Sequence, residues 1–196
     1  MEEVFDVLNE LGEFTGVVAT RDECHTKGLW HRAVYAFIVD KDFNVLLQKR
    51  SANKKLWPNR WDVTIGGHVN AGEFGRQALI RECKEELGIE ISDEDIKYLV
   101  STTSVYNKDG YVNNHYDECY LITKNVNVED LKLQEEEVSD AKYFPKKEII
   151  KRINNNYDGL TEKTVSWSIF KRILESDVLE QIVSDKNESK KIRSKK

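Results

Sequence analysis

Three glutamates that lie within one short stretch have the clearest chemical potential in the sequence: Glu82, Glu85 and Glu86. Residues three or four positions apart share one face of an α-helix, so these carboxylates would lie within about 100° of one another. The apolar residues of the same stretch form a separate stripe about 130° away: Leu79, Cys83 and Leu87. The stripe would bury the helix, and the carboxylates would then face a cleft or water.

A divalent cation would explain why like charges stand together on this helix. Glu82 and Glu86 are four positions apart, where like charges repel, so we expect a compensating charge. Mg²⁺ prefers oxygen ligands and keeps several waters. The preceding Gly66 and Gly67 would let the backbone approach a cation or phosphates without obstruction by side chains. The alternative is a solvated acidic face that pairs with neighbouring basic residues such as Arg81.

The spacing of residues around these glutamates resembles the signature of the Nudix hydrolase family. Gly67 is followed after five residues by Glu73, and seven more residues lead to the run Arg81 to Ile89, RECKEELGI. All fixed positions of the signature are present. The one soft departure is Cys83, where the family usually has an aliphatic residue, and a thiol is small and apolar enough to pack there.

The resemblance implies an α/β fold, an α/β/α sandwich with a mixed sheet, in which the signature forms a loop, a helix and a loop. It also implies hydrolysis of a diphosphate linkage in a small molecule that carries a nucleoside or another organic group. The three glutamates would hold Mg²⁺ or Mn²⁺ together with the backbone carbonyl of Gly66. Arg81 and Glu73 would pair to hold loop and helix, Gly67 would lie against the phosphates, and Gly88 would end the helix.

This assignment agrees with the chemistry of the reaction, because attack of water on a charged diphosphate needs cations to neutralise it and to acidify the water. A further base often comes from a later loop, and the segment QEEEVSDAKYF offers Glu137 nearest to the expected position. Lys49 and Arg50 end a predicted hairpin near the site and could meet phosphates. For the acidic loop and for the two basic residues alike, the alternative is a solvated surface.

The flanking segments resemble one branch of the same fold family, the isopentenyl-diphosphate isomerases. The likeness is carried by CHTKGLWHRAVYAFIVD and LLQKRSANKKLWPNRWDVTIGGH. In that branch three histidines and two glutamates hold a metal, and the residues that match are His25, His31, His68 and Glu118. Tyr116 falls where the second glutamate is expected. Histidine nitrogen is a common ligand of transition metals. Histidines that only hydrogen-bond around the cleft are the alternative.

Gly66 stands where an isomerase carries the cysteine needed to protonate a carbon–carbon double bond. The cysteines of the chain lie elsewhere, at positions 24, 83 and 119. Their odd number and wide spacing also disfavour a disulfide framework or a zinc ribbon. Hydrolysis is therefore the leading hypothesis and isoprenoid isomerisation the second. Nucleotide binding without catalysis is the third, and the intact set of signature glutamates argues against it.

The elements that would position these residues alternate between strands and helices, which is typical of a mixed α/β layer fold. Strands are predicted at 3–8, 33–40, 45–50, 61–65, 95–107, 116–124 and 141–145, and helices at 74–87, 145–153 and 162–183. Thr161 is the expected cap of the last helix, whose apolar stripe would include Val165, Ile169, Ile173 and Leu174. We expect one domain over 1–183, with an N-terminal β extension and a C-terminal helix, and a polar, lysine-rich tail over 184–196.

Composition limits the partners of the protein. Hydrophobic residues make up 39% and charged residues 33% of the chain, and the net charge is −5, so neither nucleic acid nor a membrane is expected as a partner. The N-terminus lacks the pattern of a secretory signal, which predicts a cytoplasmic protein. The family resemblance leaves a homodimer open. Structural roles are favoured for Trp57 and Trp61, although several aromatic residues could line a substrate pocket. They are Trp30, Trp57, Trp61, Tyr106 and Tyr111.

Overall fold

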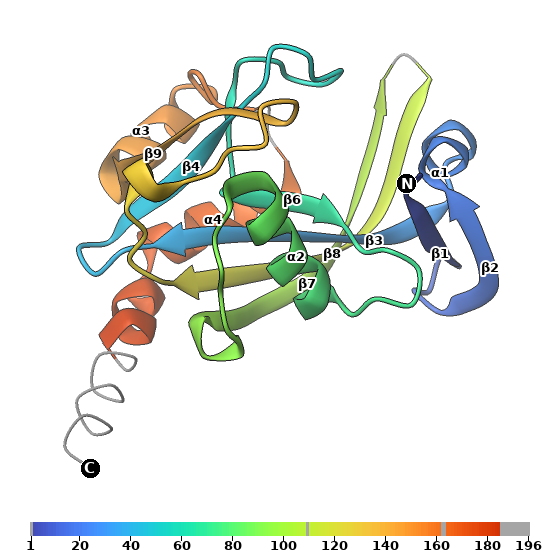
Figure 1. Ribbon diagram of the computed structural model, residues 1–196, viewed down its shortest axis with the longest axis horizontal. Helices are drawn as coiled ribbons and strands as arrows, with labels where there is room; N and C mark the ends of the chain where they lie inside the picture. The colour runs from blue at the N-terminus through green and yellow to red at the C-terminus, as the bar shows by residue number, and fades with distance from the viewer. Residues whose placement is uncertain (1, 109, 162–163, 185–196) are drawn as a thin grey trace.

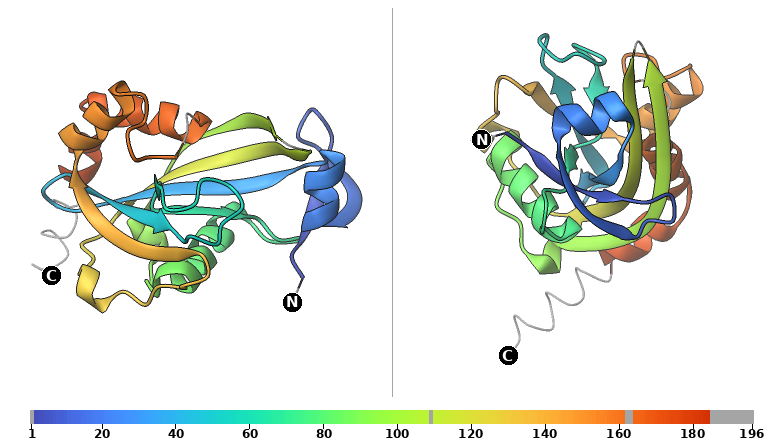
Figure 2. Two further views of the ribbon diagram at one scale, coloured as in Figure 1. Left: turned by 90° about the horizontal axis from the view of Figure 1, so that it is seen from above. Right: turned by 90° about the vertical axis from the view of Figure 1, so that its right-hand side faces the viewer.

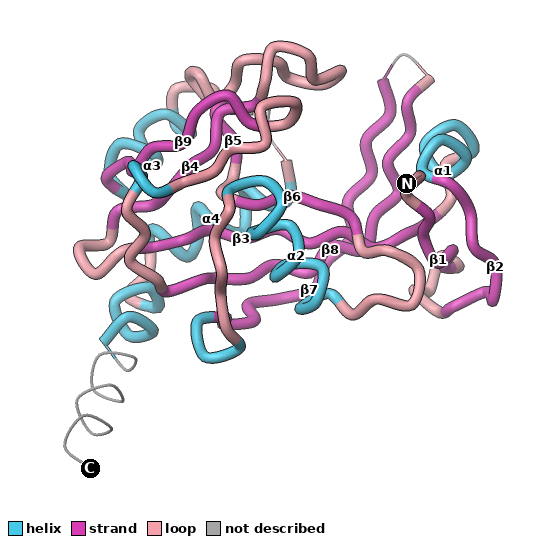
Figure 3. Tube along the Cα trace, in the orientation of Figure 1, coloured by secondary structure: helices cyan, strands magenta, loops and turns pink. Residues whose placement is uncertain are grey.

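The computed structural model describes residues 2–108, 110–161 and 164–184 of the chain, in which nine strands form one mixed sheet (Figures 1 and 3). The strands are β1 (Val4–Leu8), β2 (Phe14–Thr20), β3 (Trp30–Val39), β4 (Asn44–Arg50), β5 (Trp61–Asp62), β6 (Ile65–His68), β7 (Ile96–Lys108), β8 (Tyr111–Thr123) and β9 (Val138–Pro145). The helices are α1 (Arg21–Lys27), α2 (Gly75–Leu87), α3 (Lys146–Asn154) and α4 (Val165–Glu175), and residues 178–184 are also helical.

Strand β3 is the centre of the sheet because its apolar run is buried on both faces. It pairs in parallel with β8 along its whole length, from Trp30 opposite Asn114 to Val39 opposite Thr123. Its pairings with β1, β4 and β6 are antiparallel. This register places the middle of β8 and the glycine strand β6 on the two sides of the same stretch of β3, residues 33–36, and these three strands frame the site.

Helices cover both faces of the sheet, as the views in Figure 2 show. Leu79, Cys83 and Leu87 of α2 are fully buried and pack with residues such as Val34 of β3 in one core cluster. On the other face, α3 and α4 bury a second cluster that includes Trp167. The predicted α/β/α sandwich with a mixed sheet is confirmed, and so is the apolar stripe of α2.

The N-terminal extension is more elaborate than predicted. Strands β1 and β2 form an antiparallel pair, and α1 packs over them around a small separate cluster that includes Phe5 and Cys24. Helix α1 was not expected, although its signals are local: Thr20 accepts from the Glu23 backbone N–H in a capping box, and Gly28 ends the helix in the left-handed conformation with φ 66°.

Several element boundaries differ from the predictions. The expected strand 61–65 is two strands, β5 and β6, because each pairs with a different neighbour, β4 and β3. Strand β8 begins at Tyr111 and β9 at Val138, earlier than expected, since long-range pairing extends both. Helix α4 is capped by Thr164, whose side chain accepts from the Trp167 N–H, and not by Thr161. Its buried face carries Trp167, Phe170 and Leu174, and Ile173 packs partly buried against the same cluster. The predicted stripe was therefore right for Ile173 and Leu174 but not for the other two residues.

The domain prediction meets the structure only in part. Residue 184 is the last that the structure describes, so the rest of the predicted tail lies outside the described residues. The assignment of 1–183 to a single domain stays a prediction. Among the described helices, none combines the length and the apolar character that crossing a membrane requires.

Candidate active site

Helix α2 presents its glutamates to a polar pocket that lies beside strand β6. Glu82, Glu85 and Glu86 all line it, together with Gly66 and Gly67. Glu82 and Glu86 are only 8% and 6% exposed, whereas the Glu85 side chain is 53% exposed. Two of the three carboxylates are thus withdrawn from bulk water, which a solvated acidic face would not require.

Glycine at position 67 allows the closest approach in the site. A Cβ atom placed there would lie 2.3 Å from Cδ and Oε1 of Glu82. At Gly66, by contrast, an added Cβ would meet the Tyr35 ring at 3.3 Å. The backbone of β6 therefore lies directly against the Glu82 carboxylate only because residue 67 has no side chain.

Arg81 holds the loop and the helix together, as predicted. Its Nε and Nη2 donate to the two carboxylate oxygens of Glu73 at 3.1 and 3.0 Å. Its Nη1 donates to Glu82 at 2.7 Å and to Glu85 at 3.0 Å, and Nη2 also donates to the His68 carbonyl at 2.9 Å. Gly88 ends α2 in the left-handed conformation with φ 68° and donates its N–H back to the last turn.

Burial and mutual repulsion raise the pKa values of the two withdrawn carboxyl groups. Burial raises the pKa of Glu82, although neighbouring Arg81 opposes the shift. Burial and the nearby Glu82 raise the pKa of Glu86 to about 8. Gln48, a neutral side chain, donates a hydrogen bond to Glu86 at 3.1 Å. Such a pair gains stability from an added cation.

These features fit a hard divalent cation. Two buried carboxylates lie side by side, and Arg81 neutralises the Glu82 side of the pair but not Glu86. Glycine at position 67 leaves open the space beside Glu82 that a Cβ atom would fill. Carboxylate and carbonyl oxygens are the ligands that Mg²⁺ and Mn²⁺ prefer.

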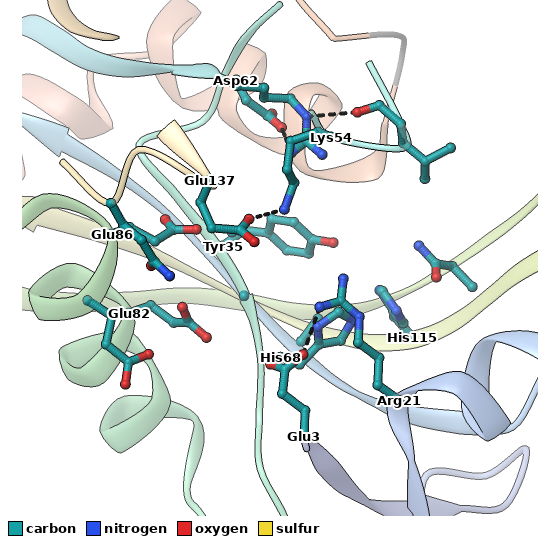
Figure 4. A pocket seen from close by; sticks show the side chains of 18 of the residues that line it. Glu3, Arg21, Tyr35, Lys54, Asp62, His68, Glu82, Glu86, His115 and Glu137 are labelled. Atoms are coloured by element: carbon teal, nitrogen blue, oxygen red, sulfur yellow. Dashed lines mark hydrogen bonds and ion pairs between the residues drawn. The ribbon is translucent and has the colours of Figure 1, made fainter. Parts of the chain in front are cut away.

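Basic side chains face the glutamates across the pocket, as Figure 4 shows for Lys54 and Arg21. Lys54 ion-pairs with Glu137, and burial together with the charges of Arg50 and Arg21 lowers its pKa to about 8. Arg50 also lines the pocket and donates to Asp62 at 3.2 Å.

Only one of the two basic residues expected at the phosphates lies in the pocket. Side chains alternate along β4, so Gln48 and Arg50 turn toward α2 and the pocket while Lys49 turns to the other side. Gln48 reaches Glu86, and Arg50 is among the residues that line the pocket, but Lys49 is not. The prediction for Lys49 was therefore wrong about its place. Glu137, expected near the site as a base, does line the pocket.

The aromatic residues separate into two groups. Trp57 and Tyr111 line the pocket. Trp61 packs edge-on against Phe144 with 4.9 Å between ring centroids, in the core beneath α3. Trp30 packs against Tyr116 at 5.1 Å. The structural role favoured for Trp61 agrees with its position, whereas Trp57 is a wall of the pocket.

The three histidines singled out in the sequence do come together, and a fourth joins them. His25, His31, His68 and His115 each offer a nitrogen, and these atoms all lie within 4.8 Å of one another. Burial lowers the pKa of each imidazole, for His31 to about 4. The four rings are therefore neutral near pH 7, the form that binds metals.

Glu118 does not join this cluster, which corrects the expectation. Along β8, His115 and Asp117 turn to the side of the cluster, so Tyr116 and Glu118 turn away. The Glu118 carboxylate contacts the Tyr120 hydroxyl and lies against Gly75, where an added Cβ would meet it at 2.3 Å. Tyr116 donates to the Glu10 carbonyl. The prediction placed the correct strand at the site with the wrong face inward.

Sequence reasoning missed Gln48, Lys54, Arg21, His115 and Asp117. Two of them had a readable signal: Arg21 lies one helical turn before His25, and His115 is the one remaining histidine of a chain that has four. Lys54 comes from a loop and Gln48 from a strand whose inward face depends on distant pairing, so no local pattern singles them out.

Comparison with known proteins identifies the family that the chain resembles. The model of the NUDIX domain matches residues 29–164. Nudix hydrolase 3 of Arabidopsis thaliana is 41% identical over 152 residues, which are 75% of this chain but only 20% of the plant protein. An uncharacterised Nudix hydrolase of Listeria monocytogenes is 38% identical over 149 residues, 76% of this chain and 83% of its own length.

More distant similarities extend in two directions. An isopentenyl-diphosphate Delta-isomerase of Salmonella arizonae is 29% identical over 124 residues, 63% of this chain and 66% of the isomerase. Among solved structures, a protein of Deinococcus radiodurans superposes with a TM-score of 0.63 at 22% identity, covering 93% of this chain and 98% of its own. At that identity the superposition bears on the fold alone.

Proposed function

The chain belongs to the Nudix hydrolase family, and from that premise we propose that it hydrolyses a diphosphate linkage in a small molecule that carries a nucleoside or a similar organic group. One observation carries the proposal: the buried carboxylates of Glu82 and Glu86 line a pocket that also holds three basic side chains, each paired with a carboxylate from outside α2. A diphosphate needs both a cation site and positive charge around it.

In this proposal Glu82, Glu85, Glu86 and the Gly66 carbonyl would hold Mg²⁺ or Mn²⁺. The bound cation would neutralise the diphosphate and acidify the attacking water. Arg81 would keep the glutamates in register, because its guanidinium contacts Glu82 and Glu85 while it is anchored on Glu73. Glu85, the exposed member, would be the ligand that moves most easily when the cation enters.

Lys54, Arg50 and Arg21 would bind the phosphate oxygens. All three line the pocket, and guanidinium and ammonium groups are strong donors to phosphate. Lys49, which the sequence suggested for this role, is replaced in the proposal by Lys54. Gly67 would contribute by letting the substrate approach the backbone of β6.

Glu137 stays our proposal for the general base. Its carboxylate is at the pocket and is paired with Lys54. When phosphate oxygens draw the Lys54 ammonium toward themselves, the Glu137 carboxylate would be left free to accept a proton from water. The pairing thus offers a way to keep this base neutralised until substrate arrives.

The organic group would lie toward Trp57 and Tyr111, the aromatic residues on the pocket wall. A flat, polarisable group such as a base could stack there. An isoprenoid tail fits less well, since most of the other lining side chains are charged or polar.

Isomerisation of an isoprenoid diphosphate is disfavoured by the absence of its acid at this site. Position 66 is glycine, and all three cysteines of the chain are buried elsewhere. Among the described residues that line the pocket there is no thiol. A sensor without activity is disfavoured because Glu82 and Glu86 are buried at a cost that binding alone does not require.

A substrate panel tests the proposal. Wild type and Glu86→Gln would be incubated with nucleoside-diphosphate-linked sugars and alcohols, dinucleoside polyphosphates and isoprenoid diphosphates, with Mg²⁺ or with EDTA. We expect release of phosphate or of a nucleoside monophosphate from at least one class, dependent on Mg²⁺ and on Glu86. Tight binding of a nucleotide with no turnover of any member would support the sensor and overturn the proposal.

A further inference from the structure

All the histidines of the chain meet at one point beside the pocket. The sequence contains four of them, and each comes from a different element: His25 from α1, His31 from β3, His68 from β6 and His115 from β8. Their ring centroids are separated by 4.5 Å (His31 and His115) to 6.1 Å (His25 and His115). His115 reaches the cluster because β8 pairs in parallel with β3, directly opposite His31.

The free nitrogens of this cluster lack partners within the protein. The Nε2 atoms of all four histidines are buried, and none has a hydrogen-bond partner. The other ring nitrogen is occupied in two of them, since Nδ1 of His25 donates to the Arg21 carbonyl at 2.7 Å and Nδ1 of His31 donates to the Leu29 carbonyl at 2.8 Å. Those bonds place the proton on Nδ1 and leave Nε2 as a lone pair directed inward.

Unpaired buried polar atoms are rare, because each costs about 1–3 kcal/mol. Four of them lie in this one cluster, and a single bound cation would satisfy all four. A tetrahedral cation about 2.0–2.1 Å from each nitrogen would hold the ligand nitrogens about 3.4 Å from one another. The four nitrogens already lie within 4.8 Å of one another, so binding would draw the most distant pair together by roughly 1.4 Å, a movement that the two rings would share.

We propose that His115 is the fourth ligand of an all-histidine metal site, and that this site takes a borderline transition ion such as Zn²⁺, Fe²⁺ or Co²⁺ and not Mg²⁺. Four imidazole nitrogens suit these ions, whereas Mg²⁺ requires oxygen ligands. Where the isomerase resemblance suggested Glu118, this chain supplies nitrogen. The change of ligand removes a negative charge from the set and increases its preference for transition ions.

Two cation sites of different chemistry would therefore border one pocket. His68 and His115 line it together with Glu82 and Glu86 (Figure 4). The oxygen site on α2 would exchange Mg²⁺ with solvent. The nitrogen site would keep its ion, because Phe5 stacks on the rings of His31 and His68 at 5.0 and 4.7 Å, and Tyr111 stacks on His25 at 4.5 Å.

The ion would also fix the N-terminal extension to the sheet. Strand β1 meets β3 through the single residue pair Leu8 and Trp30, whereas a metal would join α1 to three strands at once. His25 holds the backbone carbonyl of Arg21, whose guanidinium faces the pocket and pairs with Glu3 at 2.7 Å. Loading of the site would thus position a basic residue that we place at the phosphates.

Metal analysis of the purified full chain tests the assignment without any assay of hydrolysis. The protein would be purified without added metal, analysed by mass spectrometry of its elements, stripped with a chelator and titrated with Co²⁺. We expect close to one transition ion per chain, a visible Co²⁺ absorption band, and no displacement of Co²⁺ by a thousandfold excess of Mg²⁺. A silent titration, or displacement by Mg²⁺, would overturn the proposal.

A matched pair of variants identifies the fourth ligand. His115→Ala should weaken Co²⁺ affinity by at least about tenfold, since even outer-shell partners are worth 10–100-fold, and Glu118→Ala should leave the affinity unchanged. Loss of affinity in Glu118→Ala but not in His115→Ala would refute the ligand assignment. If His115→Ala fails to fold, the Cu²⁺ spectrum of wild type decides instead: four equivalent nitrogen splittings are expected, and three or fewer would contradict the site.

Hydrogen exchange supplies a second readout. Removal of the ion should increase amide exchange in the extension over residues 3–29 and leave α2 unchanged. Equal exchange with and without metal would refute the fixing role. Glu86→Gln should retain the transition ion in full, so loss of hydrolysis and loss of this metal are separate results.

Discussion

Replacement of Gly67 by alanine is the sharpest perturbation that the geometry offers. The new Cβ would lie 2.3 Å from Cδ and Oε1 of Glu82 and 2.6 Å from its Cγ. Carbon atoms pack at about 3.5–4.0 Å, so the Glu82 side chain must retreat by more than about 1 Å. A displacement of that size at a reacting centre costs on the order of a hundredfold in rate.

The fold should survive this change, because the atoms that must move are the end of a flexible side chain. Loss of the hydrogen bond between Glu82 and Arg81 would reduce the free energy of unfolding by about 2 kcal/mol, which lowers Tm by about 4–8 °C. The assay is turnover on a confirmed diphosphate as a function of Mg²⁺ concentration, with a thermal melt of each protein. Turnover should fall about a hundredfold, and the Mg²⁺ concentration needed for half-maximal rate should rise.

Gly66→Ala is the matched control, because it adds the same methyl group one residue earlier and keeps the backbone carbonyl. Its Cβ would meet the Tyr35 ring at 3.3 Å and Val63 at 3.7 Å, distances that small movements relieve. We expect a loss of turnover below about tenfold, since no carboxylate is displaced. Equal effects at the two positions, or a fully active Gly67→Ala, would refute the argument that Gly67 makes room for Glu82.

Three further predictions concern the charges of the site. Glu86→Gln should lower turnover by about a hundredfold or more but should stabilise the metal-free protein above pH 5. The pKa of Glu86 in the folded protein, about 8, exceeds the ordinary value of about 4.3, so wild type loses stability as pH rises between these two values. Thermal melts of the two proteins that change with pH in parallel would contradict this. Arg81→Gln should lower the free energy of unfolding of the metal-free protein by about 2 kcal/mol. Arg76→Gln, which breaks the exposed pair with Asp93 and a hydrogen bond to the Ile96 carbonyl, should lower it by only about 1 kcal/mol. Urea titrations that give equal values would refute this difference. Lys54 loses its charge as pH rises through its pKa of about 8. The KM of wild type should therefore rise above pH 8, whereas the KM of Lys54→Arg should not. Identical dependence of KM on pH in the two proteins would contradict a role of Lys54 in phosphate binding.

Local patterns in the sequence were sufficient for the signature helix. Apolar spacing predicts α2, Gly88 predicts its end, and the spacing of Glu82, Glu85 and Glu86 predicts a shared face. All of these depend on residues within about one or two helical turns, and helical geometry converts such spacing directly into direction.

The errors arose where direction depends on distant pairing. A strand shows alternation but not which face is inward, so Glu118 was taken for a ligand although His115 and Asp117 are the inward residues. For the same reason Lys49 of β4 was expected at the pocket, although its neighbours Gln48 and Arg50 are the residues that face it. The pairing of β8 with β3 and of β4 with β9 decides which face of each strand points to the site. The paired residues are more than sixty positions apart in the chain.

Oxygen tracing tests the central proposal most directly. A substrate found in the panel would be turned over by wild type in water enriched in oxygen-18, with Mg²⁺, and its products examined by mass spectrometry. Hydrolysis at the glutamate site predicts one oxygen-18 atom in a phosphate-bearing product of wild type and none above background with Glu86→Gln. The account would be contradicted if no phosphate product acquired the label while an isoprenoid diphosphate, turned over in deuterated water, acquired deuterium on carbon.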